Sequence, residues 1–212
     1  MPTADARFAI IGLTNGPAFY INPCLKQQVA WSNARHLWTG AYSIVSYPTA
    51  AQLKRYGGAG TLPQRLARVG AAQAGFNLTN MRRAGLSTPF VWVDVEPVRG
   101  WAWSTPANNN AFLNGVLNGY AAGHVKTGIY SYPYGWKQIT GGRRLPNPTW
   151  VPSGKDTIAA AAAKCGTRSF SGGPVWIGQS TVGSRDVDVL CPGVTGTRAG
   201  TPSRMRLLFV ST

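Results

Sequence analysis

Acidic residues are scarce in this chain of 212 residues, since six Asp and Glu stand against 21 Lys and Arg and leave a formal net charge of +15. So basic a chain predicts an anionic partner, such as nucleic acid, an anionic membrane surface or an acidic cell-wall polymer. The basic residues occur singly or in pairs, with no long basic run and no zinc-finger, leucine-zipper or RNA-recognition signature. The pattern therefore disfavours nucleic acid and favours a polyanionic surface.

Long apolar runs are absent as well. No stretch approaches the roughly 20 residues that a membrane helix needs, and residues 1–10 lack the basic-then-apolar pattern of a signal peptide. We expect no membrane span, and no export signal in the sequence as printed. The length, a hydrophobic content of 44% and eight Trp fit one globular domain. We place this domain at residues 1–200, with residues 201–212 as a C-terminal tail.

Patterns for metals and cofactors are missing too. The two histidines, His36 and His124, are far apart in sequence and neither belongs to a metal-binding pattern. The stretch "GLTNGPAF", which follows the first apolar run, is not a dinucleotide-binding fingerprint. We expect no metal and no cofactor.

Short β-rich runs alternate with segments of helical character, which is typical of parallel βα units. Helix starts are indicated at Asn22-Pro23, Leu62-Pro63 and Thr105-Pro106, and Asp156 is a candidate cap for "TIAAAAAKC". The pattern predicts an α/β fold, and the missing phosphate-binding loop favours a modified (β/α) TIM-like barrel over a doubly wound sheet. The seven expected strands are residues 7–13, 40–47, 89–96, 126–132, 148–152, 174–181 and 186–190.

Two of the few carboxylates, Asp94 and Glu96, stand two residues apart at the end of the run "PFVWVDVE". Side chains at i and i+2 of a strand project to the same face, with Cα atoms about 6.6 Å apart. Because Pro97 ends the strand, both should lie on the active-site face of a barrel, and the apolar lead-in should raise at least one pKa. One protonated acid and one anionic partner are what a glycosidase uses.

A carboxylate at a strand end can also cap a helix or pair with an arginine. For a lone residue that structural interpretation is the better one. Two carboxylates on one face, in a chain with only six, favour a chemical role.

An ordered set of motifs spans nearly the whole chain: "ARFAIIGLTNGPAFYINPCLKQQVAWSNA", "GAYSIVSY", "VWVDVEP", "TGIYSYPYGW", "VWIGQST" and "DVDVLC". In this order the set resembles the lysozymes of glycoside hydrolase family 25, in particular a secreted actinobacterial branch. The resemblance implies a modified βα barrel that cuts the β-1,4 bond between N-acetylmuramic acid and N-acetylglucosamine in peptidoglycan. It also implies a secreted or cell-wall-associated protein.

The family's Asp-x-Glu falls on Asp94 and Glu96, so Glu96 resembles the general acid and Asp94 the carboxylate that assists the 2-acetamido group of the substrate. For Trp92 and Trp150 we expect core packing rather than sugar stacking. The resemblance implies six further groove residues: Tyr42, Tyr130, Trp176, Gln179, Asp186 and Asp188.

The chain departs from the family at its start. Family members begin with a strand bearing "D-x-S", whose Asp completes the acidic cluster, whereas this sequence begins on what resembles the second strand. We expect a barrel that lacks its first strand, with a gap between "RFAIIGL" and "DVDVL". The only spare apolar segment that could cover this gap is "RMRLLFV". Without the missing carboxylate we expect weak or no hydrolysis.

Three cysteines, an odd number, agree with a missing piece, because the related secreted proteins have a fourth just after that strand. We expect a disulfide between Cys165 and Cys191, which stand at the ends of the last helix and the last strand, and a free Cys24.

Three functions remain open at this point. The first is a muramidase that acts on peptidoglycan and is drawn to anionic wall polymers by its charge. The second is a catalytically inactive module that binds the cell wall or another carbohydrate. The third is a nucleic-acid-binding protein, which only the charge supports.

Overall fold

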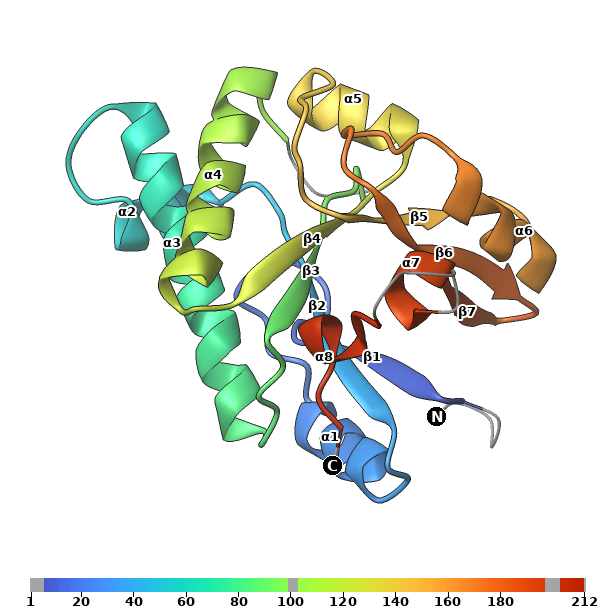
Figure 1. The fold of residues 1–212 in the computed structure, drawn as a ribbon. Helices are drawn as coiled ribbons and strands as arrows, with labels where there is room; N and C mark the ends of the chain where they lie inside the picture. The colour runs from blue at the N-terminus through green and yellow to red at the C-terminus, as the bar shows by residue number, and fades with distance from the viewer. Residues whose placement is uncertain (1–5, 99–102, 197–202, 212) are drawn as a thin grey trace.

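The computed structural model describes residues 6–98, 103–196 and 203–211. A single seven-stranded sheet, in the order β1-β2-β3-β4-β5-β6-β7, curls into an open half-barrel, as Figure 1 shows. Every expected strand is present. The strands are β1 (Phe8–Gly12), β2 (Trp38–Ile44), β3 (Phe90–Asp94), β4 (Lys126–Tyr130), β5 (Thr149–Pro152), β6 (Val175–Val182) and β7 (Arg185–Leu190).

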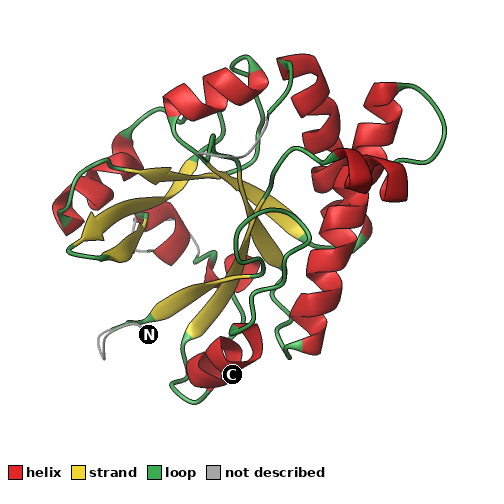
Figure 2. Cartoon of the chain, turned by 180° about the vertical axis from the view of Figure 1, so that it is seen from behind, coloured by secondary structure: helices red, strands yellow, loops and turns green. Residues whose placement is uncertain are grey.

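Helices lie around the sheet (Figure 2), and none in the described part of the chain is both long and apolar enough to cross a membrane. They are α1 (Leu25–Asn33), α2 (Ala50–Tyr56), α3 (Leu62–Arg83), α4 (Pro106–Ala122), α5 (Pro133–Thr140), α6 (Ile158–Ala163), the 3₁₀ turn η1 (Lys164–Gly166), α7 (Pro192–Thr195) and α8 (Met205–Leu208).

The proline signals place the long helices correctly. Thr61 caps α3 two residues before Pro63, and Thr105 caps α4 directly before Pro106. Proline suits the first turn of a helix because it has no N–H that would need a partner there. Two expected starts are wrong by one or two residues. Thr157, not Asp156, caps α6, and α1 begins at Leu25 because Asn22 instead accepts a hydrogen bond from the Cys24 backbone N–H.

The alternation of side chains along β3 divides the apolar residues into two cores. Val91 and Val93 point outward into a cluster that includes α3 and α4. Phe90 and Trp92 point into the barrel, where they pack with Trp150 and Ile177. Trp92 and Trp150 are buried, as expected of core residues. The interior of the half-barrel is therefore an aromatic, water-poor medium.

The segment of residues 203–211 closes the amino-terminal end of this interior. Phe209 is buried with its ring 5.5 Å from that of Phe8, and Val210 pairs with Thr39 beside β2. The apolar segment "RMRLLFV" thus runs from Val194, which accepts from the Arg204 N–H, to its bridge with Thr39, and it adds no strand to the sheet beside β1 or β7. The expected domain boundary at residue 200 falls outside the described residues and stays a prediction.

One pairing departs from the expected parallel units, because β6 and β7 are antiparallel. Only Gly183 and Ser184 separate the two strands, which is enough for a hairpin but far too short for a parallel crossover. Gly183 supplies the positive φ that such a tight turn needs. As a consequence, β7 begins at the end of the sheet where the parallel strands finish.

The sheet order leaves β1 and β7 as the two edges of the half-barrel, and no other described strand pairs with their outer sides. The fold is therefore an open, incomplete TIM-like barrel, as expected from the sequence.

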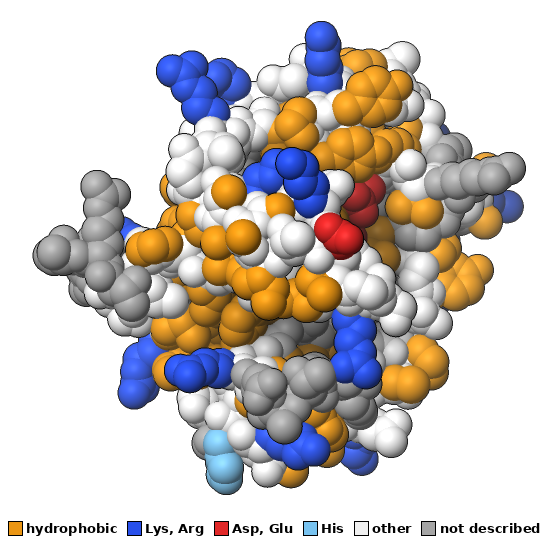
Figure 3. Space-filling model, turned by 90° about the vertical axis from the view of Figure 1, so that its right-hand side faces the viewer, with side chains coloured by type: hydrophobic (Ala, Val, Ile, Leu, Met, Phe, Trp, Pro, Cys, Tyr) orange, Lys and Arg blue, Asp and Glu red, His pale blue; other side chains and the backbone are white. Residues whose placement is uncertain are grey.

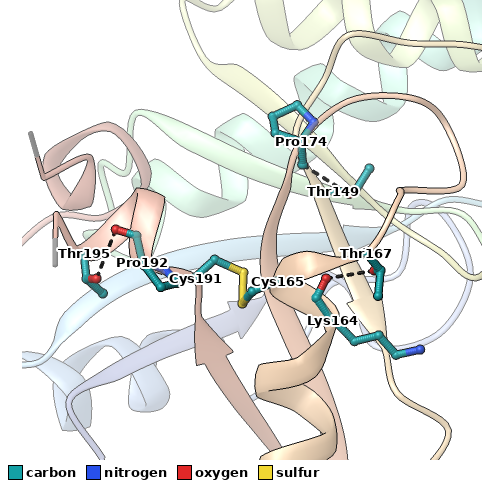
Figure 4. Close-up of a disulfide and its surroundings, with 8 residues drawn as sticks. All are labelled: Thr149, Lys164, Cys165, Thr167, Pro174, Cys191, Pro192 and Thr195. Atoms are coloured by element: carbon teal, nitrogen blue, oxygen red, sulfur yellow. Dashed lines mark hydrogen bonds between the residues drawn. A yellow bond between two sulfur atoms is a disulfide. The ribbon is translucent and has the colours of Figure 1, made fainter. Parts of the chain in front are cut away.

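A disulfide fastens β7 to the turn after α6 (Figure 4). Cys165 and Cys191 have Cα atoms 5.3 Å apart and close a loop of 26 residues. Cys24 is free and exposed. Both cysteine predictions are confirmed.

Removing this disulfide should destabilise the fold. A bridge that closes a loop of this length contributes about 3 kcal/mol in the chain-entropy model, and each kcal/mol corresponds to about 2–4 °C in a chain of this size. We expect the double variant Cys165→Ala/Cys191→Ala to melt about 6–12 °C lower by calorimetry. The control is Cys24→Ala, which removes an exposed thiol and should leave the melting temperature unchanged. An equal loss in both variants would contradict the assignment.

Candidate active site

Asp94 and Glu96 lie at the carboxyl end of β3, on the inward face of the sheet. Asp94 is the last residue of the strand and only 6% exposed, and Glu96 is half-buried. Strand-like backbone contacts continue past β3, because Val95 N–H donates to the Tyr130 carbonyl. The indole N–H of Trp103 donates to the Glu96 carbonyl at 3.1 Å. The two carboxyl groups are thus held on an ordered backbone.

Asp94 is the most deeply buried carboxyl group of the site. Burial, and after it the charge of Glu96, raises the pKa of Asp94 well above its ordinary value. Its Oδ1 is buried without a hydrogen-bond partner. A buried acceptor without a partner is costly, so this oxygen is available to an N–H or O–H group that a ligand brings.

Glu96 is the second carboxyl group at the end of β3 with a raised pKa. Burial raises its pKa, and the charge of Asp186 raises it further. Asp186 lies near the start of β7, where Thr181 donates a hydrogen bond of 2.9 Å to its Oδ1. The hairpin turn therefore brings a carboxylate of β7 close enough to act on the acid of β3.

Asp188 lies one step further along β7. The indole N–H of Trp150 donates to its Oδ1 at 2.9 Å, yet burial raises the pKa of Asp188 to about 7. Gln179, its partner in the β6–β7 register, also hydrogen-bonds to it, and the Tyr130 hydroxyl donates to Gln179 Oε1 at 2.8 Å. A chain of hydrogen bonds thus links four strands across the half-barrel.

The two tyrosines expected in the groove face the carboxylates. Burial raises the pKa of Tyr42, and the charges of Asp94, Asp186 and Asp188 add to this effect. Burial and the neighbouring acids, Glu96 first among them, likewise raise the pKa of Tyr130. Both rings also pack edge-on against Trp150.

Trp176 is not part of this group. It lies three residues before Gln179 on β6, where its ring packs 6.1 Å from Phe90 and beneath the guanidinium of Arg204. The structure therefore brings together seven of the eight expected site residues. Trp176 lies apart from them, in the aromatic core near Phe90.

A cavity of about 680 Å³ adjoins the carboxylates on the side of β5 and β6. Acidic side chains gather on this face of an otherwise cationic molecule, as Figure 3 shows. The residues that line the cavity are Tyr130, Pro152, Gly154, Lys155, Asp156, Thr157, Gln179, Ser180, Thr181 and Asp186. All five acidic residues in the described part of the chain thus belong to the site or to this cavity.

Sequence reasoning missed two parts of the site. Tyr132 lies just beyond β4, and burial together with the charge of Glu96 raises its pKa. Its position two residues after Tyr130 in "GIYSY" is the signal that could have revealed it, since i and i+2 share a face. The loop of residues 153–157 carried no such signal.

The arrangement suits proton transfer and charge stabilisation by carboxyl groups. Within the described residues, no group of three or more His, Cys, Asp and Glu side chains is placed to hold a metal ion.

Comparison with known proteins agrees with the fold. A family model described as Lysozyme-like protein 1 matches residues 61–150. No curated protein matches the chain. Among solved structures, a bacterial lysozyme from Streptomyces coelicolor is 18% identical with a TM-score of 0.65, over 97% of this chain and 87% of that one.

Two fungal structures are also similar. A muramidase from Acremonium alcalophilum is 20% identical with a TM-score of 0.60, over 94% of this chain and 86% of that one. A family GH25 lysozyme from Aspergillus fumigatus is 17% identical with a TM-score of 0.53, over 72% and 68%. The chain therefore has the lysozyme-like fold of glycoside hydrolase family 25, and the resemblance seen in the sequence is confirmed for the fold.

The raised pKa of Asp188 predicts how stability depends on pH. An acid whose pKa rises from 3.8 to about 7 on folding stabilises the folded state below about pH 4, and this contribution is lost as the pH rises to about 7. We expect Asp188→Asn to gain stability relative to the unaltered protein between pH 4 and pH 8, by several degrees in melting temperature. The difference between the two proteins is followed by calorimetry across this range.

Because the comparison uses the change with pH in the melting-temperature difference between the two proteins, any effect of the amide on packing that does not depend on pH cancels. Gln27→Ala, which changes an exposed side chain of α1 without a titratable group, is the control and should show a flat difference. A flat difference for Asp188→Asn as well would contradict the prediction.

Proposed function

We propose that this protein is a glycoside hydrolase of the muramidase type, which cleaves the β-1,4 bond between N-acetylmuramic acid and N-acetylglucosamine in peptidoglycan. The observation that carries the proposal is the half-buried Glu96, with a raised pKa, between the carboxyl groups of Asp94 and Asp186. Its setting in a lysozyme-like fold supports the same conclusion.

Glu96 is the general acid in this proposal. Its raised pKa retains a proton closer to neutral pH than an ordinary glutamic acid does. It gives that proton to the glycosidic oxygen as the bond from this oxygen to the anomeric carbon breaks. Deprotonated Glu96 then accepts a proton from the water that completes hydrolysis.

Asp94 assists the substrate's own 2-acetamido group. Its unpartnered Oδ1 accepts the acetamido N–H, which aims the carbonyl oxygen at the anomeric carbon. That oxygen forms the new bond to the anomeric carbon, and the hydrogen bond from the acetamido N–H to Asp94 stabilises the positive charge that develops on the acetamido group. The mechanism is substrate-assisted and needs no nucleophile from the protein.

The remaining residues bind the glycan. Tyr42 and Tyr130 offer ring edges and hydroxyl groups beside the carboxylates, and Gln179 fixes the Tyr130 hydroxyl. Asp186 and Asp188 accept hydrogen bonds from sugar hydroxyls. We assign Trp176 to packing, because its ring lies against Phe90 in the core of the half-barrel.

The charge distribution supports attraction to anionic wall polymers. In the described part of the chain, no Lys or Arg forms an ion pair with Asp or Glu, so internal carboxylates do not neutralise the positive charge that an external polyanion would meet. A disulfide is typical of oxidising compartments. We propose that the protein works outside the cell or in association with the cell wall.

An inactive wall-binding module is the second candidate. The family resemblance places a further Asp on a strand before β1, and residues 6–24 supply no acidic side chain. The sheet is open between β1 and β7, where that strand would lie. This alternative keeps the groove and loses the chemistry.

Replacing Glu96 with glutamine separates the two candidates. The amide has the shape of the acid but no proton to give, so we expect Glu96→Gln to slow the clearing of purified cell walls by about 10²–10⁴-fold while binding in a pull-down persists. Asp94→Asn should lose less if Asp94 only orients the acetamido group. Gln27→Glu, at an exposed position of α1 outside the cavity, is the control and should clear walls normally.

The outcomes are distinct. Undiminished clearing by Glu96→Gln would remove Glu96 from the mechanism. Binding without clearing by the unaltered protein would favour the inactive module.

The pH profile tests the coupling of Glu96 to Asp186. Hydrolysis requires protonated Glu96, so the rate should fall as the pH rises through its raised pKa. Asp186→Asn removes a charge that raises this pKa, and we expect the alkaline limb of kcat/KM to move to lower pH. Activity near pH 5 should change less than activity near pH 8. An unmoved limb, or the same displacement in Asp156→Asn, would refute the coupling.

A further inference from the structure

One cationic side chain lines the cavity beside the carboxylates. Lys155 lines it, and the other charged side chains of the cavity are Asp156 and Asp186. Lys155 forms no ion pair with either of them. Because Asp156 and Asp186 repel anions, an anionic group that enters the cavity has one favourable neighbour, the ammonium of Lys155.

The backbone of Lys155 is held in a defined place. Gly154 adopts a φ of 68°, which turns the chain at the end of β5 in a conformation that favours glycine. The Lys155 N–H donates to Ser153 Oγ at 3.0 Å, and the Ser153 N–H donates to the Gln179 carbonyl at 2.7 Å.

The other end of the loop is also fixed to β6. Ser180 Oγ donates to the Thr157 carbonyl at 2.7 Å and lies 2.7 Å from Ser153 Oγ. Residues 153–157 therefore form a loop whose two ends share one anchor on β6. Such a loop presents Lys155 from a constant position next to Gln179 and Asp186.

We propose that Lys155 is a specificity-determining residue that binds a carboxylate carried by the glycan. The inference rests on the proposed function, since it names the substrate class of the same groove. Muramic acid carries a lactyl ether whose carboxylate is either free or joined to a peptide stem with carboxylates of its own. Lys155 thus selects muramyl glycans over neutral chitin-type chains.

The test measures binding and not cleavage, so it does not depend on catalysis. Lys155→Met and Lys155→Arg are made in the Glu96→Gln background. Lys26→Met on α1 is the matched control, because it removes an exposed lysine that does not line the cavity. Three probes are titrated: glycan chains with peptide stems, the same chains with the stems removed by an amidase, and chitohexaose.

We expect Lys155→Met to weaken binding of a carboxylate-bearing probe about threefold to fivefold at low ionic strength, as for an exposed charge pair. Lys155→Arg should restore binding, and added salt should reduce the difference. A loss confined to stem-bearing chains identifies the stem carboxylate, and a loss on stripped chains identifies the lactyl carboxylate. Binding of chitohexaose should not change.

Unchanged binding of both carboxylate-bearing probes would overturn the inference, and so would an equal loss on chitohexaose or with Lys26→Met. Failure of the Lys155 inference can be distinguished from failure of the proposed hydrolysis. Wall clearing that persists while Lys155→Met binds all probes normally refutes the role of Lys155 alone. Absence of clearing by the unaltered protein, with Lys155-dependent binding, refutes hydrolysis alone.

Discussion

Desolvation of carboxyl groups is the constraint on which the site depends. Asp94, Glu96 and Asp188 border an interior filled by Phe90, Trp92 and Trp150, and burial is the largest cause of each raised pKa. An ionised carboxylate is costly in such surroundings unless it is paired. No cation within the described residues forms an ion pair with them. Trp150 and Gln179 hydrogen-bond to Asp188, whereas the buried Oδ1 of Asp94 is left to a proton or a ligand donor.

The antiparallel hairpin supplies the second half of the site. A parallel β7 would start at the opposite end of the sheet and present Asp186 far from Glu96. The two-residue reversal at Gly183 and Ser184 instead starts β7 beside the parallel strand ends, and the register pairs Asp188 with Gln179. The disulfide at Cys191 fastens the other end of β7. Two elements far apart in the sequence thus form one electrostatic unit.

The parts of the fold that follow from local rules could be predicted from the sequence. Strand alternation placed Asp94 and Glu96 on one face, and proline with threonine caps located α3 and α4. The antiparallel pairing of β7 was not expected, although the short turn permits little else. The position of Trp176 against Phe90, apart from the other expected site residues, could not be read from the motif, because a motif gives order along a strand but not depth in a barrel. The loop around Lys155 could not be found, since its anchors on Gln179 and Ser180 exist only after folding.

The position of Phe209 has a consequence for how the chain acquires its structure during synthesis. The ring of Phe209 packs on that of Phe8, about 200 residues earlier in the chain, and Val210 pairs with Thr39. A nascent chain must therefore wait, with Phe8 and Ile10 without their final neighbours, until residue 210 has left the ribosome. Such distant contacts are slow to form and leave apolar surface exposed meanwhile. Completion of the half-barrel thus follows the exit of residue 210 from the ribosome, and the incomplete half-barrel is the species that a chaperone would meet.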